Sequence, residues 1–312
     1  MHTFHVLALQ VILFAGPGAA SPQDPPAHRI SVNVDLVVLQ ASVSDRKGRI
    51  ASDLREQDFE VYEDGVRQSI RLFRHEDTPV TVGLVVDHSG SMRPKLSDVI
   101  TAAGTFVRAS SLEDEMFVVN FNENVTMGLP VEMPFTNRSD ELTRAINAPV
   151  TGQTALYDAI LAAQRRLQTG NRDKKVLIVI SDGGDNASKH RLEEVVKMAG
   201  ESTALIYTVG IFDNGDADRN PGVLRRLAAV TGGQSYFPSH PGEVVSICER
   251  IARDIRHQYT LGYVPNHAAR PGAYRAIQVV ARAAGRTKLV VRTRSGYIEG
   301  GESASVNDEP AK

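Results

Sequence analysis

Two hydrophobic patterns alternate along the middle of the chain. Runs made mostly of apolar and β-branched residues cover 80–86, 175–180 and 204–211, which is typical of strands that are buried on both faces of a sheet. Stretches with helical spacing of apolar residues lie between these runs, for example 155–167. Strands that alternate with helices indicate βαβ units. The region 78–258 is therefore predicted to be an α/β domain with a mostly parallel sheet covered by helices on both faces.

Alternating apolar and polar residues dominate the regions on either side of this domain. The pattern predicts about four short strands within 30–77, with Asp64-Gly65 as a hairpin turn, and further strands within 259–299. Each region has few large apolar residues and needs a partner surface. We expect 30–77 and 259–299 to be two halves of one small β-sandwich-like unit, into which the α/β domain is inserted. Two independent β units are the alternative.

The two ends of the chain have simpler patterns. Residues 6–15 form an apolar run and small residues occupy 18–20, so 1–20 is predicted to be a signal peptide. This predicts an exported protein, periplasmic or secreted. The Pro-rich segment 21–29 is predicted to be a linker and the polar segment 300–312 a disordered tail. The mature chain contains no apolar stretch of about 18 residues that would span a membrane.

Composition excludes several classes of protein. The 35 basic and 37 acidic residues nearly balance, so nucleic acid is not expected as a partner. Cys248 is the only cysteine, which excludes an internal disulfide and a Cys-based zinc site. It lies in an apolar helical pattern and is predicted to be a buried structural thiol. The nine His residues show no His-x-x-x-His spacing, and the Gly-x-Ser-x-Gly nucleophile motif is absent.

Oxygen-bearing side chains gather where buried strands are expected to end. Asp87, Ser89 and Ser91 follow the first buried run on alternate residues, and Asp182 follows the second. Thr154 lies in a turn that opens a helix, a position where its hydroxyl can serve as the N-cap. Ligands of parallel sheets gather at the carboxyl ends of strands. Two carboxylates and three hydroxyls form an all-oxygen site suited to a hard cation such as Mg²⁺.

These three segments resemble the metal-ion-dependent adhesion site (MIDAS) of von Willebrand factor type A (VWA) domains. The matching segments are Asp87-His88-Ser89-Gly90-Ser91-Met92, Thr-Gly-Gln-Thr-Ala-Leu-Tyr-Asp-Ala-Ile around Thr154, and Ile-Ser-Asp-Gly-Gly-Asp-Asn around Asp182. The resemblance spans about 78–258 and implies a doubly wound, Rossmann-like VWA domain with mixed-sheet character. The flanking β regions contain Phe-Glu-Val-Tyr-Glu-Asp-Gly at 59–65 and Tyr-Thr-Leu-Gly-Tyr at 259–263. They resemble, more loosely, those of exported bacterial von Willebrand-type proteins common in Acidobacteria.

The resemblance also implies a ligand set and a function. It implies magnesium held directly by Ser89, Ser91 and Thr154, with Asp87 and Asp182 acting mainly through water or hydrogen bonds. Mn²⁺ and Ca²⁺ are alternative ions. It implies no catalytic residues and no organic cofactor, but binding of a protein partner through an Asp or Glu of that partner. His88, at a position where the family tolerates many residues, is expected to point to the rim and tune access to the site.

The leading hypothesis is an exported, non-enzymatic adhesion or scaffolding protein with one Mg²⁺-dependent site. One alternative is an accessory subunit of an envelope complex in which the metal is structural. Another is a metal-dependent hydrolase, but no candidate base stands beside Asp87 and Asp182 in the sequence. The acidic segment 213–218 looks like a calcium loop, yet it lacks the Gly and Glu of an EF-hand and is predicted to be a solvated loop.

Overall fold

The computed structural model describes the chain in five ranges, which form two hydrophobic cores. One core belongs to an α/β domain and the other to a β unit built from both sides of it. The predicted signal peptide, linker and tail, and the acidic segment 213–218, lie outside the described residues. The described ranges are 36–75, 77–212, 219–266, 272–286 and 288–299.

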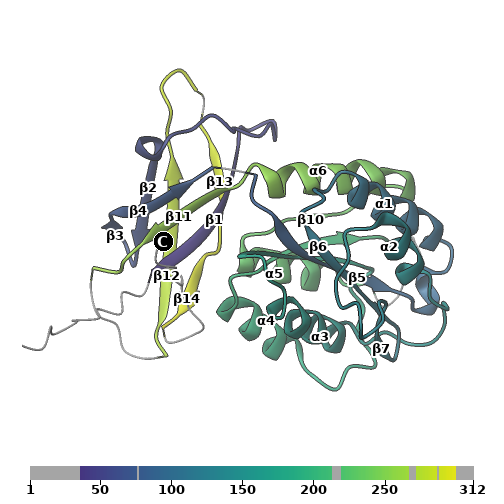
Figure 1. Cartoon of the computed structure of the whole chain (residues 1–312). Coiled ribbons are helices and arrows are strands. Elements are labelled where there is room, and N and C mark those ends of the chain that lie inside the picture. Colours follow the sequence, from purple (N-terminus) through teal and green to yellow (C-terminus); the bar gives the residue numbers. More distant parts are fainter. Residues whose placement is uncertain (1–35, 76, 213–218, 267–271, 287, 300–312) are drawn as a thin grey trace, which may run out of the picture. The chain divides into compact units, whose positions relative to one another are not determined.

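A six-stranded sheet forms the centre of the α/β domain (Figure 1). Its strands lie in the order β10-β9-β8-β5-β6-β7, and all neighbours are parallel except β6 and β7. This confirms the doubly wound, Rossmann-like fold with mixed-sheet character. The strands are β5 (Val80–Asp87), β6 (Glu115–Phe121), β7 (Val125–Met127), β8 (Lys174–Ser181), β9 (Leu205–Gly210) and β10 (Ser235–Tyr236).

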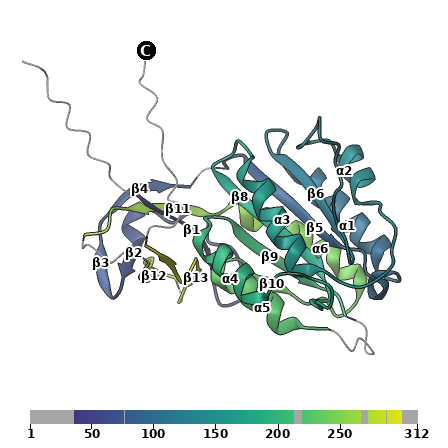
Figure 2. The same cartoon turned by 90° about the horizontal axis from the view of Figure 1, so that it is seen from below.

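Helices cover both faces of this sheet (Figures 1 and 2). The helices α1 (Leu96–Arg108), α2 (Ser139–Ile146) and α6 (Val244–Arg256) form one layer, and α3 (Leu156–Gln168), α4 (Leu192–Glu201) and α5 (Pro221–Thr231) form the other. Short 3₁₀ helices occur at η1 (Glu56–Asp58), η2 (Gly90–Met92) and η3 (Pro241–Glu243).

Cys248 is buried as predicted, and burial raises the pKa of its thiol to about 12. Within the described ranges, no helix has the length and apolar character needed to cross a bilayer.

The β unit consists of two four-stranded antiparallel sheets, ordered β13-β1-β11-β4 and β14-β12-β2-β3. Strands that precede the α/β domain pair with strands that follow it, for example β1 with β11 and β2 with β12. The α/β domain is therefore inserted between two halves of one β unit, as the sequence pattern predicts. The strands are β1 (Val37–Ser44), β2 (Phe59–Glu63), β3 (Val66–Gln68), β4 (Ile70–Arg74), β11 (Tyr259–Tyr263), β12 (Tyr274–Ala281), β13 (Val290–Arg292) and β14 (Gly296–Ile298).

Local contacts explain where two of the strands end. Strand β7 ends at Met127, where Gly128 comes so close to the Ala145 carbonyl that an added Cβ would lie 2.5 Å from its oxygen. Pro130 then offers no amide proton to a strand ladder. The predicted hairpin between β2 and β3 is confirmed, since Asp64 and Gly65 both adopt positive φ angles, of 48° and 79°.

A buried network of charged and hydroxyl groups joins the two sheets of the β unit. Glu63 of β2 accepts hydrogen bonds from the hydroxyls of Tyr263 (2.5 Å) and Tyr297 (2.9 Å) and pairs with Arg275, which is 1% exposed. The Arg275 Nε atom lies 2.6 Å from a carboxylate oxygen of Glu299. Burial and the hydrogen bonds to Glu63 raise the pKa of both tyrosines. Because Tyr263 belongs to the opposite sheet from Glu63 and Arg275, the network crosses the core of the unit.

Removal of the Glu63 carboxylate should destabilise the chain. We expect Glu63→Ala to lower the free energy of unfolding by about 3–5 kcal/mol, because the buried Arg275 would lose its buried partner. The control is Arg282→Ala, which breaks the exposed pair with Glu60 and should cost less than about 1 kcal/mol. Denaturant unfolding followed by tyrosine fluorescence suits a chain without Trp. Equal losses in the two variants would contradict a stabilising network.

A second buried charge lies at the end of the α/β sheet opposite to the carboxyl end of β5. Lys174 is the first residue of β8, is buried, and donates a hydrogen bond from Nζ to the Ile255 carbonyl near the end of α6. Burial lowers the pKa of Lys174 to about 8, against the opposing effect of Asp77, Asp254 and Asp114. The folded protein therefore releases this proton more readily than the unfolded chain.

This pKa shift predicts a pH-dependent stability. Between pH 8 and the ordinary lysine value of 10.5, only the unfolded chain keeps the proton on Lys174, so stability rises with pH in that window. Relative to Lys174→Met, the wild type should gain on the order of 1–3 kcal/mol between pH 7 and pH 10. Denaturant unfolding of both proteins at pH 7, 8.5 and 10 measures this gain. A difference that does not change with pH would show that Lys174 keeps its ordinary pKa.

Candidate metal centre

The carboxyl end of β5 lies at the point where the strand order of the sheet reverses. β6 adjoins β5 on one side and β8 adjoins it on the other, so the segments that follow β5 and β8 meet there. Open α/β sheets bind ligands at such switch points. Asp87 ends β5 and Asp182 directly follows β8, which places both predicted carboxylates at this edge.

The structure brings four of the five predicted ligand residues into direct contact with one another. The Ser91 hydroxyl donates a hydrogen bond to Asp182 Oδ2 at 2.6 Å, and the Ser89 and Ser91 hydroxyl oxygens are 3.2 Å apart. Asp87 accepts hydrogen bonds from the Ser89 amide at 2.8 Å and from the Ser181 hydroxyl at 2.7 Å. Ser91 is partly exposed, whereas the other three predicted residues are buried. The result is a compact cluster of oxygen atoms in which Ser91 is the partly exposed member.

Thr154 approaches the same edge on a separate turn. Two backbone hydrogen bonds join this turn to the segment after β5: the Thr151 amide donates to the His88 carbonyl at 3.0 Å, and the Gly90 amide donates to the Gly152 carbonyl at 3.2 Å. Thr154 itself is 6% exposed. The turn that carries Thr154 is thus joined by main-chain contacts to the segment that carries Ser89 and Ser91.

The expected capping role of Thr154 is wrong. The N-cap of α3 is Ala155, which has no side chain to cap the helix. The first turn of α3 is bound instead by the loop after β8, where Asp185 Oδ2 accepts a hydrogen bond from the Tyr157 amide at 2.9 Å. The hydroxyl of Thr154 is therefore not used to cap the helix that follows it.

The expected position of His88 is also wrong. His88 is 1% exposed and does not point to the rim. Its Nε2 atom lies 3.0 Å from Asn120 Oδ1, and Asn120 Nδ2 donates to the Ala145 carbonyl at 2.7 Å. Burial lowers the pKa of the imidazole. The side chain that alternates with Asp87 and Ser89 thus points away from the site and into the domain.

Ser181 is a site residue that the motif alone does not reveal. Its hydroxyl donates to Asp87 and accepts a hydrogen bond from the Gly183 amide at 2.9 Å. The available signal was its place directly before Asp182, at the end of a buried strand. Gly183 has a φ of 82°, and a Cβ added there would lie 2.5 Å from the Asn220 carbonyl oxygen, so a glycine is required after Asp182.

The electrostatics of the cluster favour a cation. Burial raises the pKa of Asp87 to about 6, and nearby Asp182 adds to the rise, while hydrogen bonds from Ser89 and Ser181 oppose it. A positive charge between the two carboxylates would favour their ionised forms. In the described part of the chain, no group of three or more His, Cys, Asp or Glu residues could hold a metal. A cation bound here must therefore depend on the hydroxyl oxygens, which fit a hard ion.

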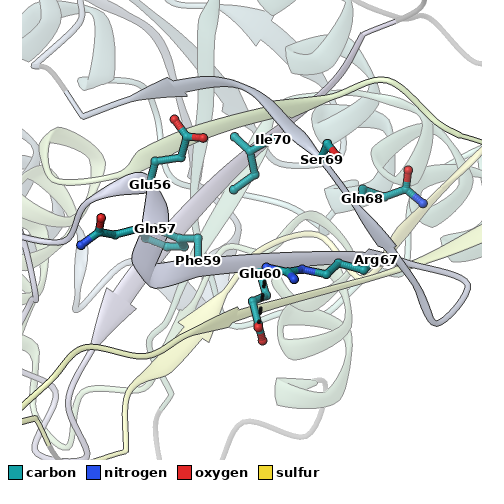
Figure 3. A pocket seen from close by; sticks show the side chains of 8 residues that line it. All are labelled: Glu56, Gln57, Phe59, Glu60, Arg67, Gln68, Ser69 and Ile70. Atoms are coloured by element: carbon teal, nitrogen blue, oxygen red, sulfur yellow. Dashed lines mark ion pairs between the residues drawn. The ribbon is translucent and has the colours of Figure 1, made fainter.

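A pocket of about 530 Å³ lies in the β unit (Figure 3). Residues of η1, β2, β3 and β4 line it, among them Phe59, Ile70 and the ion pair of 3.9 Å between Arg67 and Glu60. None of the residues predicted to bind metal lines this pocket. It is therefore a separate feature from the candidate metal centre.

Comparisons with known proteins agree with this architecture. A von Willebrand factor type A protein from Catenulispora acidiphila is 14% identical, with a TM-score of 0.53, over 78% of this chain and 74% of that one. Proximal thread matrix protein 1 from the mussel byssus is 14% identical, with a TM-score of 0.51, over 62% of this chain and 51% of that one. The vWF domain of the type V pili tip protein Mfa5 from Porphyromonas gingivalis is also 14% identical, with a TM-score of 0.49, over 57% of this chain and 95% of that one. No curated protein matches the sequence.

The two structures with TM-scores above 0.5 support the fold alone, and the family follows from the sequence. The profile of the von Willebrand factor type A domain matches residues 81–247, which include all five predicted ligand residues. VWA domains are generally non-enzymatic modules that mediate protein–protein binding. Because the match covers more than half of the 312 residues, the chain belongs to the von Willebrand factor type A domain family.

Proposed function

We propose that this chain is an exported, non-enzymatic protein that binds another protein through a Mg²⁺ ion held at the end of β5. The observation that carries the proposal is the contact of the Ser91 hydroxyl with Ser89 at 3.2 Å and with Asp182 at 2.6 Å, at the switch point of the sheet. Membership of the VWA family supports a binding role rather than catalysis. The apolar run and small residues at the N-terminus support export.

The five predicted residues divide into two groups. Ser89, Ser91 and Thr154 would hold the ion directly through neutral hydroxyls. Asp87 and Asp182 would act through water or hydrogen bonds, as Asp182 already does toward Ser91. Mn²⁺ and Ca²⁺ also take oxygen ligands, so they are alternatives to Mg²⁺.

This division determines which partner chemistry fits. Mg²⁺ supplies an electrophilic coordination position when its inner shell contains neutral oxygens and water. A carboxylate oxygen from an Asp or Glu of the partner is the natural ligand for that position. The protein's own two carboxylates balance the charge of one divalent ion from outside this shell. The partner site is therefore proposed to be an exposed acidic side chain.

The first test is direct metal binding. Ser89→Ala combined with Ser91→Ala should weaken Mg²⁺ binding by on the order of 100-fold or more, since two direct ligands are lost. The fold should survive, because both hydroxyls lie in a turn outside the hydrophobic core. Calorimetric titration with Mg²⁺ measures the loss, and Ser97→Ala on the exposed face of α1 is the matched control. An unchanged affinity in the double variant would remove the site assignment.

The second test separates a binding ion from a structural one. Immobilised protein in Mg²⁺ should retain a partner from a bacterial envelope extract and release it in EDTA. Thr154→Asp should keep Mg²⁺ binding but lose most of the partner binding. An internal carboxylate in the inner shell would reduce the charge of the ion and weaken its attraction for the partner's carboxylate. Calorimetry checks the metal, and the amount of retained partner checks the second effect. Full retention of the partner by Thr154→Asp or in EDTA would leave the metal a purely structural role.

A further inference from the structure

Thr154 differs from the other four predicted ligand residues in its place in the fold. Asp87, Ser89, Ser91 and Asp182 end or closely follow the buried strands β5 and β8, which fix their positions. Thr154 lies on the connection from α2 to α3, and no strand leads into it. Its position must therefore depend on the loops packed around it.

The loop after β8 binds both backbone groups of Thr154. Asn186 Oδ1 accepts a hydrogen bond from the Thr154 amide at 2.8 Å. The amides of Asn186 and Ala187 donate to the Thr154 carbonyl at 2.9 and 3.0 Å. These three hydrogen bonds fix the peptide planes on both sides of Thr154. They thereby fix the direction of its Cα–Cβ bond, and with it the space available to the hydroxyl.

The β6–β7 turn binds the residues on either side. Glu123 Oε2 accepts a hydrogen bond from the Gln153 amide at 3.1 Å, and the Asn122 carbonyl accepts one from the Ala155 amide at 2.8 Å. A Cβ added to Gly152 would lie 1.6 Å from Glu123 Oε2, so this glycine makes room for the carboxylate. Three successive amides are thus bound from two loops, and only the central one belongs to a predicted ligand residue.

From this arrangement we propose that Asn186 is a positioning residue for the metal site and acts through Thr154. The side chain of Asn186 determines where the Thr154 main chain lies, and the Thr154 hydroxyl is the group that would meet the ion. Loss of residues that orient metal ligands commonly lowers metal affinity 10–100-fold. The inference rests on the proposed function, since it requires that Thr154 bind the ion.

A double-mutant cycle in the full chain tests this coupling. Mg²⁺ affinity is measured by calorimetry for the wild type, Asn186→Ala, Thr154→Ala and the double variant. We expect Asn186→Ala to weaken binding by about 10-fold or more in the wild type and to have little further effect once Thr154 is replaced. Asn186→Asp keeps an oxygen acceptor for the Thr154 amide and should bind Mg²⁺ at least as well as the wild type.

Two further measurements exclude a general loosening of the loop. Ser188 belongs to the same loop but binds α3, where its hydroxyl accepts a hydrogen bond from the Asp158 amide at 3.1 Å. Ser188→Ala should therefore leave Mg²⁺ affinity within about 3-fold of the wild type. In metal-free protein, hydrogen exchange of the peptide that contains Thr154 should accelerate in Asn186→Ala and not in Asn186→Asp.

The outcomes distinguish this inference from the function on which it rests. A wild type that does not bind Mg²⁺ would overturn the proposed function and this inference together. A wild type that binds Mg²⁺, with equal affinity in Asn186→Ala, would overturn only the positioning role. Independent losses in the double-mutant cycle, or an equal loss in Ser188→Ala, would do the same.

Discussion

The burial of β5 on both faces is the constraint on which the rest of the structure depends. Every residue from Val80 to Asp87 is buried, and Gly83 sits so close to its neighbours that a Cβ would lie 2.4 Å from Phe117. A carboxylate at the end of such a strand must be satisfied by nearby donors. Asp87 therefore binds the Ser89 amide and the Ser181 hydroxyl, and in the same turn the Ser91 hydroxyl binds Asp182.

The sequence predicts the fold and the common edge of the sheet at which Asp87, Ser89, Ser91 and Asp182 lie, because both follow from short-range patterns. Apolar runs locate the parallel strands, and residues that follow strand ends must meet at one edge of the sheet. The same alternation that points Asp87 and Ser89 into the site also points His88 away from it, so its burial was predictable. The hydrogen bond from the Tyr157 amide to Asp185 at the start of α3 was not predictable. Asp185 lies in the loop after β8, and no local pattern near Thr154 reveals this contact.

The β unit shows a similar division. Strand periodicity places Glu63 on the same inner face as Phe59 and Val61, and this face is buried over the whole of β2. Periodicity also places Arg275 on the inner face of β12. What a single strand cannot reveal is that these two charges meet, because their contact depends on a pairing between residues more than 200 positions apart. Charged residues at inward positions were the only available signal that a compensating partner had to exist.

Domain insertion has a consequence for the entropy of chain closure. The two halves of the β unit are separated by the whole α/β domain, so their pairing from an unfolded chain closes a very long loop. Once the inserted domain is folded, the start of its first strand lies beside the end of its last helix, as the ion pair between Asp77 and Arg256 shows. The loop to be closed then shrinks to the few residues that connect β4 and β11 to the domain. Folding of the inserted domain thus lowers the entropic cost of assembling the unit that surrounds it.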